Sequence, residues 1–138
     1  MANYIATSRT NYFTVTDEEQ YKKLFCNLTA ESNIEDFTKT DLDGKIVHGF
    51  GAYDSIGYID PDTEENDFEI FLQELQKILP EGEAFIYLES GHEKLRYVVG
   101  DIIVVTANDN VRLSISEQAK LLAKSLLNNE DFDTVMEY

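Results

Sequence analysis

The sequence predicts an α+β fold, with an antiparallel sheet of about four to six strands and three helices packed mainly on one face of that sheet. Three segments repeat apolar residues at helical spacing, and the segments between them are short and rich in β-branched and aromatic residues. In the second half of the chain, turn residues join successive strands as hairpins. We expect a single domain over residues 1–138, with a ferredoxin-like or related split topology.

The first half should begin with a β segment over residues 4–15 and continue with a helix over residues 17–28. Thr16 and Glu19 have the spacing of a capping box, which predicts the start of this helix. After a polar stretch, residues 45–53 should form another strand. The helix should bury an apolar stripe made of Tyr21, Leu24, Phe25 and Leu28.

Residues 58–75, which we call the acidic segment, hold seven acidic residues and no Lys or Arg. The segment should begin as a loop at Asp60-Pro61 and become a helix near Asn66 or Asp67, where capping side chains are available. Its apolar residues recur at i, i+3, i+4 and i+7, so its acidic residues should face water on the opposite side. The expected result is a coherent negative surface.

The second half should supply three adjacent antiparallel strands over residues 84–89, 95–106 and 111–114. A turn is expected at residues 90–93, and a β-bulge at residues 100–101.

A last helix should begin after Ser114, because Ser114 and Glu117 repeat the capping-box spacing, and it should end at Asn128. The acidic tail at residues 130–138 is expected to be a mobile or a partner-binding end.

The formal charge of −16 comes from 27 acidic and 11 basic residues. A surface with this much negative charge repels nucleic acid and anionic membranes, and it attracts basic proteins. The single cysteine, Cys26, fits a reducing compartment, and the start of the chain lacks the pattern of a signal peptide. We therefore expect a cytoplasmic protein that contacts neither nucleic acid nor membrane directly.

No pattern indicates catalysis or a metal site, so we expect a non-enzymatic protein without a cofactor. Asp60, Asp62 and Glu64 alternate as at the start of a calcium loop, but Glu65 occupies the position where that loop needs Gly. His92 has an acid, a hydroxyl and an amine nearby in sequence, yet catalytic groups must converge around a pocket in space.

Two stretches resemble a family of small acidic proteins carried on plasmids and integrative elements. They are residues 1–19, with MANY, NYF and DEE, and residues 82–97, with GEA and ESGHEKLRY. The resemblance implies no catalytic or binding residue. It implies a genetic context, since genes of this kind often lie among anti-restriction and anti-CRISPR genes.

Charge and resemblance together predict an inhibitor of a nucleic-acid-targeting defence, anti-CRISPR or anti-restriction. Its acidic face would act as a DNA mimic in the basic channel of a Cas nuclease or restriction enzyme. The residues expected to bind the partner are Asp60, Asp62, Glu64, Glu65, Asp67, Glu69 and Glu74, with a second set of tail residues, Glu130, Asp131 and Asp133.

Two alternatives remain open at this point. An adaptor or immunity-type protein could bind another protein through apolar contacts, with exposed aromatic residues such as Tyr53, Tyr58 or Tyr138 as hot spots. A small hydrolase or ligand-binding domain could be built around His92.

Overall fold

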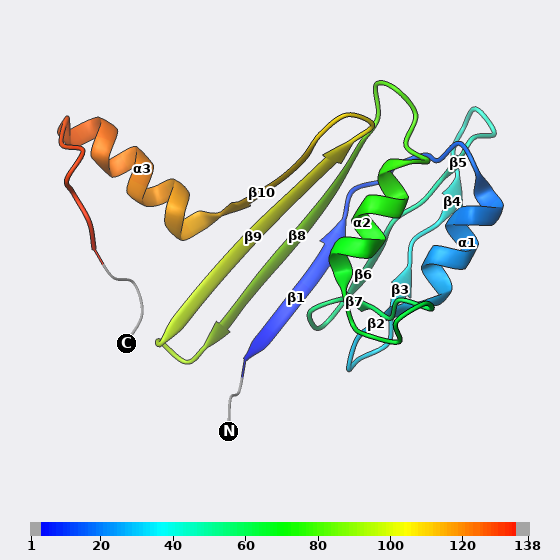
Figure 1. Cartoon of the computed structure of the whole chain (residues 1–138), viewed down its shortest axis with the longest axis horizontal. Coiled ribbons are helices and arrows are strands. Elements are labelled where there is room, and N and C mark those ends of the chain that lie inside the picture. The colour runs from blue at the N-terminus through cyan, green and yellow to red at the C-terminus, as the bar shows by residue number, and fades with distance from the viewer. Residues whose placement is uncertain (1–3, 135–138) are drawn as a thin grey trace.

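The computed structural model describes residues 4–134, in which two helices cover one face of a six-stranded antiparallel sheet (Figure 1). The expected α+β class is therefore confirmed. In chain order the elements are β1 (Ile5–Thr10), α1 (Glu18–Cys26), β2 (Leu28–Thr29), β3 (Glu35–Asp36), β4 (Lys39–Thr40), β5 (Ile46–Val47), β6 (Phe50–Ala52), β7 (Gly57–Tyr58), α2 (Phe68–Gln76), β8 (Ala84–Glu93), β9 (Tyr97–Thr106), β10 (Asn110–Ser114) and α3 (Ile115–Leu127).

The large sheet has the strand order β10-β9-β8-β1-β6-β3, and β2-β7 and β4-β5 form two small ribbons. Strands β6 and β8 are joined through α2 and lie on either side of β1, which makes one split β-α-β unit. A ferredoxin-like sheet interleaves two such units. Here β1 and β3 are joined through α1 and lie on either side of β6, which is the second unit, so the strands β8-β1-β6-β3 have the ferredoxin-like arrangement. Strands β9 and β10 extend this sheet beyond β8 as successive hairpins.

The core lies between the sheet and helices α1 and α2, and phenylalanine dominates it. Phe13, Phe50, Phe71 and Phe85 are all fully buried. Phe85 from β8 contacts Phe13 and Phe71 edge-on, with ring centroids 5.1 and 6.1 Å apart. Such aromatic contacts stabilise a core beyond the simple burial of area.

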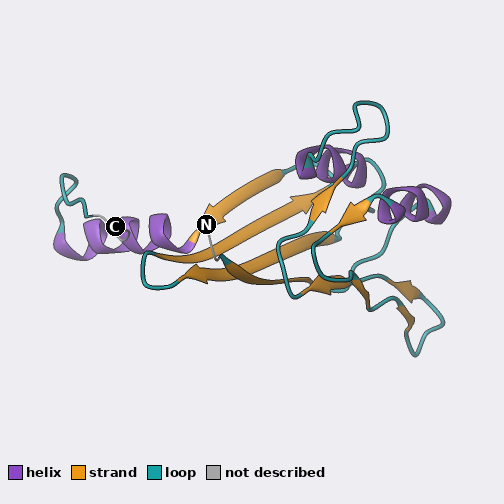
Figure 2. Cartoon of the chain, turned by 90° about the horizontal axis from the view of Figure 1, so that it is seen from below, coloured by secondary structure: helices purple, strands orange, loops and turns teal. Residues whose placement is uncertain are grey.

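Helix α3 does not take part in this core. Figures 1 and 2 show it beyond the end of β10, at the opposite end of the molecule from α1. None of its residues is buried. The expectation that the helices pack mainly on one face of the sheet thus holds for α1 and α2, whereas α3 stands apart. Within residues 4–134, no helix combines the length and the apolarity that crossing a bilayer requires.

The start of α1 differs from the predicted capping box. Asp17 is the N-cap, and its carboxylate accepts the backbone N–H of Gln20 at 3.0 Å. The Thr16 hydroxyl instead donates to the carbonyl of Ile78 at 3.3 Å, which ties the start of α1 to the end of α2. The prediction was wrong by one residue because two adjacent residues can both cap a helix.

The predicted strand over residues 45–53 is broken at His48 and Gly49. β5 pairs with β4, whereas β6 pairs with β1 in the large sheet. Gly51 allows the close pairing with β1, since a Cβ there would lie 2.7 Å from the carbonyl oxygen of Ser8.

The predicted turn at residues 90–93 is also wrong, because β8 continues to Glu93 and the reversal falls at residues 94–96. Lys94 adopts the left-handed backbone conformation, with φ 49°. Gly91 serves a close approach and not a turn, since a Cβ there would lie 2.4 Å from the Tyr4 hydroxyl. The expected bulge at residues 100–101 is absent, as the pairing of β8 with β9 is unbroken through both residues.

Candidate protein-binding surface

The acidic segment folds into β7, a loop and α2, and the structure gives its carboxylates different roles. Asp60 does not face outward: it is 8% exposed. Its carboxylate accepts the backbone N–H of Asp62 at 3.0 Å and the hydroxyl of Thr63 at 3.3 Å. Asp60 therefore closes its own loop, and its carboxylate is not available to a partner.

Asp67 is the N-cap of α2, and its carboxylate accepts the backbone N–H of Glu69 at 3.1 Å. The Asp67 N–H donates in turn to the carbonyl of Tyr58 at 2.7 Å, which fixes where the loop enters the helix. Asp67 is exposed, but part of its hydrogen-bonding capacity is taken up by the helix.

Both acidic residues inside α2 have basic partners. Glu69 forms an ion pair with Arg112 of β10, and Glu74 pairs with Lys77 one turn further along the helix. The glutamates and their partners remain at least partly exposed, so each pair contributes little to stability. Each pair nevertheless reduces the negative charge that the face of α2 offers to a partner.

Three carboxylates of the acidic segment are exposed, have no ion-pair partner among residues 4–134 and, unlike Asp67, do not cap a helix: Asp62, Glu64 and Glu65. Glu64 holds the left-handed conformation, with φ 62°, at the point where the loop reverses. The N–H of Asp60 donates to the carbonyl of Glu65 at 2.9 Å, which closes the loop from its other side. We call these three residues the loop acids.

The tail acids form a separate group. Glu130, Asp131 and Asp133 follow α3 and lie at the far end of the molecule from α2 (Figure 1). Asp133 pairs with Lys120 at 3.4 Å, and the Thr134 N–H together with the Lys120 ammonium holds the Asp133 pKa below its usual range. The two predicted sets of acids therefore do not join into one surface.

The tyrosines expected as hot spots in the alternative function differ in their exposure. Tyr58 is 3% exposed and packs against Phe71, so it cannot anchor a partner, whereas Tyr53 is 79% exposed. Tyr138 lies outside the described residues.

His92 is exposed near the end of β8 and lines an apolar groove with Ile5, Leu95 and Val98 among others. That groove brings no carboxylate to His92 that could orient it as a catalytic base.

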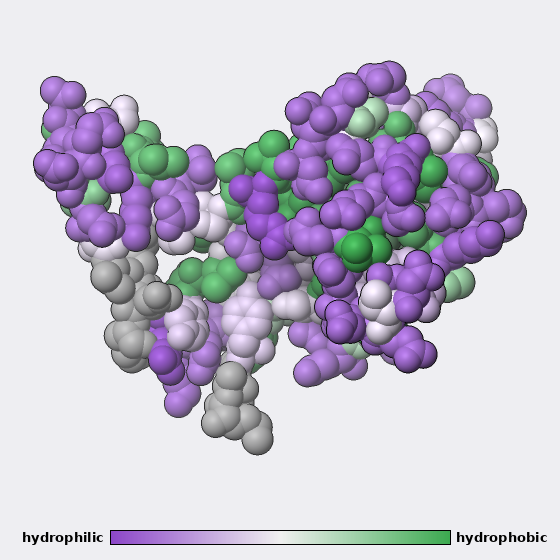
Figure 3. Space-filling model, in the orientation of Figure 1, coloured by the Kyte–Doolittle hydropathy of each residue, from purple (hydrophilic) through white to green (hydrophobic). Residues whose placement is uncertain are grey.

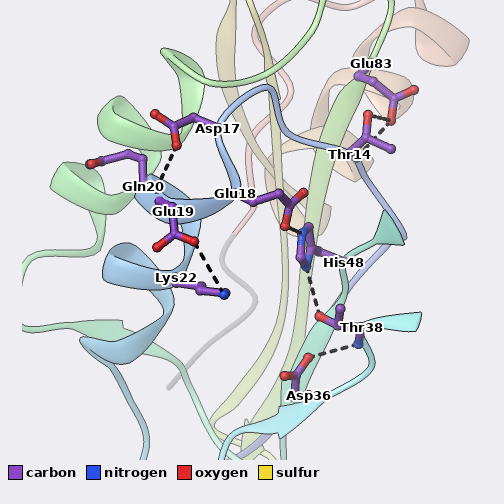
Figure 4. Close-up of polar contacts among 10 residues, drawn as sticks. All are labelled: Thr14, Asp17, Glu18, Glu19, Gln20, Lys22, Asp36, Thr38, His48 and Glu83. Atoms are coloured by element: carbon purple, nitrogen blue, oxygen red, sulfur yellow. Dashed lines mark hydrogen bonds and ion pairs between the residues drawn. The ribbon is translucent and has the colours of Figure 1, made fainter. Parts of the chain in front are cut away.

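Sequence reasoning missed a row of three polar groups that joins α1 to the β3–β6 region (Figure 4). The Nε2 atom of His48 lies 2.8 Å from the Glu18 carboxylate, and its Nδ1 atom lies 3.0 Å from the Thr38 hydroxyl. His48 is 4% exposed, and the Tyr21 ring lies over it with centroids 4.1 Å apart. Hydroxyl, imidazole and carboxylate also occur together in catalytic triads, but this imidazole is closed to a substrate. These three side chains therefore have a structural role, since they join α1 to the β3–β6 region.

A second missed cluster surrounds Glu89 on the helix-covered face of the sheet. One carboxylate oxygen accepts the hydroxyls of Tyr4 and Ser55, both at 2.9 Å, and the other accepts the Tyr87 hydroxyl at 2.8 Å. Asp101 pairs directly across from Glu89, on β9. Burial and the nearby Glu89 charge raise the Asp101 pKa. Three hydroxyl donors occupy Glu89, so this cluster is a structural network.

Comparison with known proteins gives no match to any family model, curated protein or solved structure. Across residues 4–134, no group of three or more His, Cys, Asp or Glu side chains is placed to hold a metal ion. Charge and side-chain exposure are therefore the properties of this chain that bear on its function.

Proposed function

We propose that this protein is a non-enzymatic inhibitor of a nucleic-acid-targeting defence enzyme, of the anti-CRISPR or anti-restriction kind. Its acidic surface would occupy the basic channel in which a Cas nuclease or a restriction enzyme holds nucleic acid. Such channels are strongly positive, since they bind a phosphate backbone. A folded protein with outward carboxylates can compete for them without contacting nucleic acid itself.

The observation that carries this proposal is the distribution of charge along the chain. Residues 12–93, which we call the acidic body, hold 20 of the 27 acidic residues and five of the 11 basic ones. Residues 94–138 hold seven acidic and five basic residues, so they are close to neutral. Nearly all of the net charge therefore lies on the part of the molecule that carries α1, α2 and the acidic loop.

The loop acids are the best candidates for the contact itself. Asp62, Glu64 and Glu65 are exposed, and the loop that carries them is closed by the Asp60 carboxylate. Because the loop is already ordered by these hydrogen bonds, it loses less conformational entropy when it binds a partner, and this favours affinity. Glu69 and Glu74 would add to the contact only if a basic partner replaced Arg112 and Lys77.

The proposal can be tested by plasmid transformation into cells that carry an active restriction or CRISPR system. The test variant is Asp62→Asn/Glu64→Gln/Glu65→Gln, which retains the loop-closing Asp60. The wild-type protein should restore transformation, and this variant should lose that effect, because exposed carboxylates at a close contact provide both steering and affinity.

The matched control removes the same number of charges from the α3 end of the molecule, in Glu117→Gln/Glu130→Gln/Asp131→Asn. All three residues are exposed. The control should protect plasmids as the wild type does. Equal loss in both variants would mean that only net charge matters, and full activity of the loop variant would contradict the proposed contact.

A further inference from the structure

Helix α3 is amphipathic, yet residues 4–134 leave its apolar side uncovered. Its hydrophobic residues Leu121, Leu122, Leu126 and Leu127 are between 55% and 77% exposed. A helix of 13 residues is marginal in water on its own and normally depends on packing of its apolar side. Burial of these leucines against a surface outside residues 4–134 would stabilise the helix.

The chain attaches α3 to the sheet at one end only. Ile115, the first residue of α3, packs over Gly100 of β9, where a Cβ would lie 2.8 Å from the Ile115 side chain. Gly100 alternates with Asp101, so it lies on the sheet face opposite α1 and α2. Figure 2 shows no helix beneath this face at β8, β9 and β10.

The same face of β9 and β10 exposes further apolar residues. Val98, Val111 and Leu113 are between 36% and 62% exposed. Val98 is two residues from Gly100 along β9, and Val111 and Leu113 pair with Val104 and Ile102, so all three lie on the uncovered side. Figure 3 also shows hydrophobic side chains on α3 where it borders the hollow that separates it from the rest of the molecule. We call the following eight residues the apolar arm surface: Val98, Val111, Leu113, Ile115, Leu121, Leu122, Leu126 and Leu127.

The charge of this region indicates what covers it. Residues 97–127 hold three acidic and three basic residues, so they are neutral in a chain of charge −16. A basic partner would gain most by binding the acidic body. Two copies of the chain repel each other everywhere except where neutral surfaces meet, and the apolar arm surface is such a place.

The exposed area is sufficient for a homodimer of modest size. At the usual transfer free energy, a fully buried Val, Leu or Ile side chain corresponds to about 60–120 Å² of apolar surface. Eight side chains that are about half exposed then offer roughly 250–500 Å². Interfaces are about 60% apolar, which implies roughly 400–800 Å² per copy, up to the standard size for a stable complex.

We propose that a second copy of this chain covers the apolar arm surface and that the protein is a two-fold symmetric homodimer joined through α3, β9 and β10. In a two-fold interface the same patch serves both copies, so α3 of each chain packs against the arm of the other. The acidic bodies then point away from the interface and remain accessible. This inference does not depend on the proposed function.

The test is the molar mass in solution, measured by light scattering over a range of protein and salt concentrations. The wild-type protein should have twice the chain mass of 15.8 kDa. Added NaCl should favour the dimer, because it screens the repulsion between two chains of charge −16. A mass of 15.8 kDa at every concentration and salt level would overturn the proposal.

The variant Leu122→Glu/Leu126→Glu should shift the mass to that of one chain while its circular dichroism stays native, since neither residue is buried. The control is Leu42→Glu, at a fully exposed position on the β4–β5 hairpin of the acidic body, and it should remain dimeric. A dimeric α3 variant, or dissociation by the Leu42 change, would refute the interface. Binding to a basic partner weakens with salt, whereas this dimer strengthens, so the two proposals fail separately.

Discussion

Asp101 provides a stability prediction whose sign and size follow from the sheet. It faces Glu89 across the β8–β9 pair, on the face that α2 covers in part. Like charges directly opposite each other in a sheet are destabilising, by an amount on the order of 0.2–1 kcal/mol. Burial adds to this cost, and the Arg112 charge offsets some of it. We therefore expect Asp101→Asn to stabilise the protein at neutral pH by about 0.5–1 kcal/mol.

The pH dependence follows from the direction of the pKa shift. Burial and the charge of Glu89 raise the Asp101 pKa above its ordinary value of 3.8, so the folded state binds this proton more tightly than the unfolded state. The contribution of Asp101 to stability then falls as pH rises through the folded-state pKa. The advantage of the Asn variant should accordingly be full at neutral pH and disappear once the carboxyl is protonated in the folded protein.

Urea unfolding at one protein concentration measures this effect. With an m-value of about 1–3 kcal/mol/M, the midpoint should rise by roughly 0.2–1 M at neutral pH and by much less in acid. Asp43→Asn removes one negative charge from an exposed hairpin position, and it serves as the matched control for net charge. A midpoint for Asp101→Asn that does not exceed that of the control would refute the reasoning.

Three further changes test the fold. Phe71→Ala removes a fully buried ring, and thermal or urea unfolding should show a loss of about 3–5 kcal/mol. Gly51→Ala places a methyl 2.7 Å from the Ser8 carbonyl oxygen, so it should push β1 from β6 and cost about 1–3 kcal/mol by the same assay. Asp60→Ala removes two hydrogen bonds, each worth about 1 kcal/mol. Hydrogen exchange should therefore become faster at residues 62–65, and unchanged exchange there would show that another group closes the loop.

Local signals predicted the elements that depend on local chemistry. Asp67 and Ser114 cap α2 and α3 as their sequence positions indicate, and Asn128 ends α3 in the left-handed conformation. Some strand and turn boundaries that depend on distant partners were not predicted. The break between β5 and β6 follows from two different strand partners. Gly91 lies inside β8, next to the Tyr4 hydroxyl, and does not mark the turn that its place in the sequence suggested.

The candidate surface was predictable in composition but not in detail. Helical periodicity places Glu69 and Glu74 outward, yet it cannot show that Arg112, 43 residues beyond Glu69, neutralises one of them. The sequence does not distinguish Asp60 from the neighbouring acidic residues, although hydrogen bonds turn its carboxylate inward. Which carboxylates remain free depends on tertiary pairs, and sequence spacing contains no record of those pairs.

The most direct test of the central claim is a fluorescence anisotropy competition for a guide-loaded Cas nuclease or a restriction enzyme that holds a labelled DNA duplex. We predict that the wild-type protein and the Glu117/Glu130/Asp131 control displace the duplex. We also predict that added salt weakens this competition and that the Asp62/Glu64/Glu65 variant competes far less well. Displacement that is equally strong with the loop variant, or that does not depend on salt, would contradict the account.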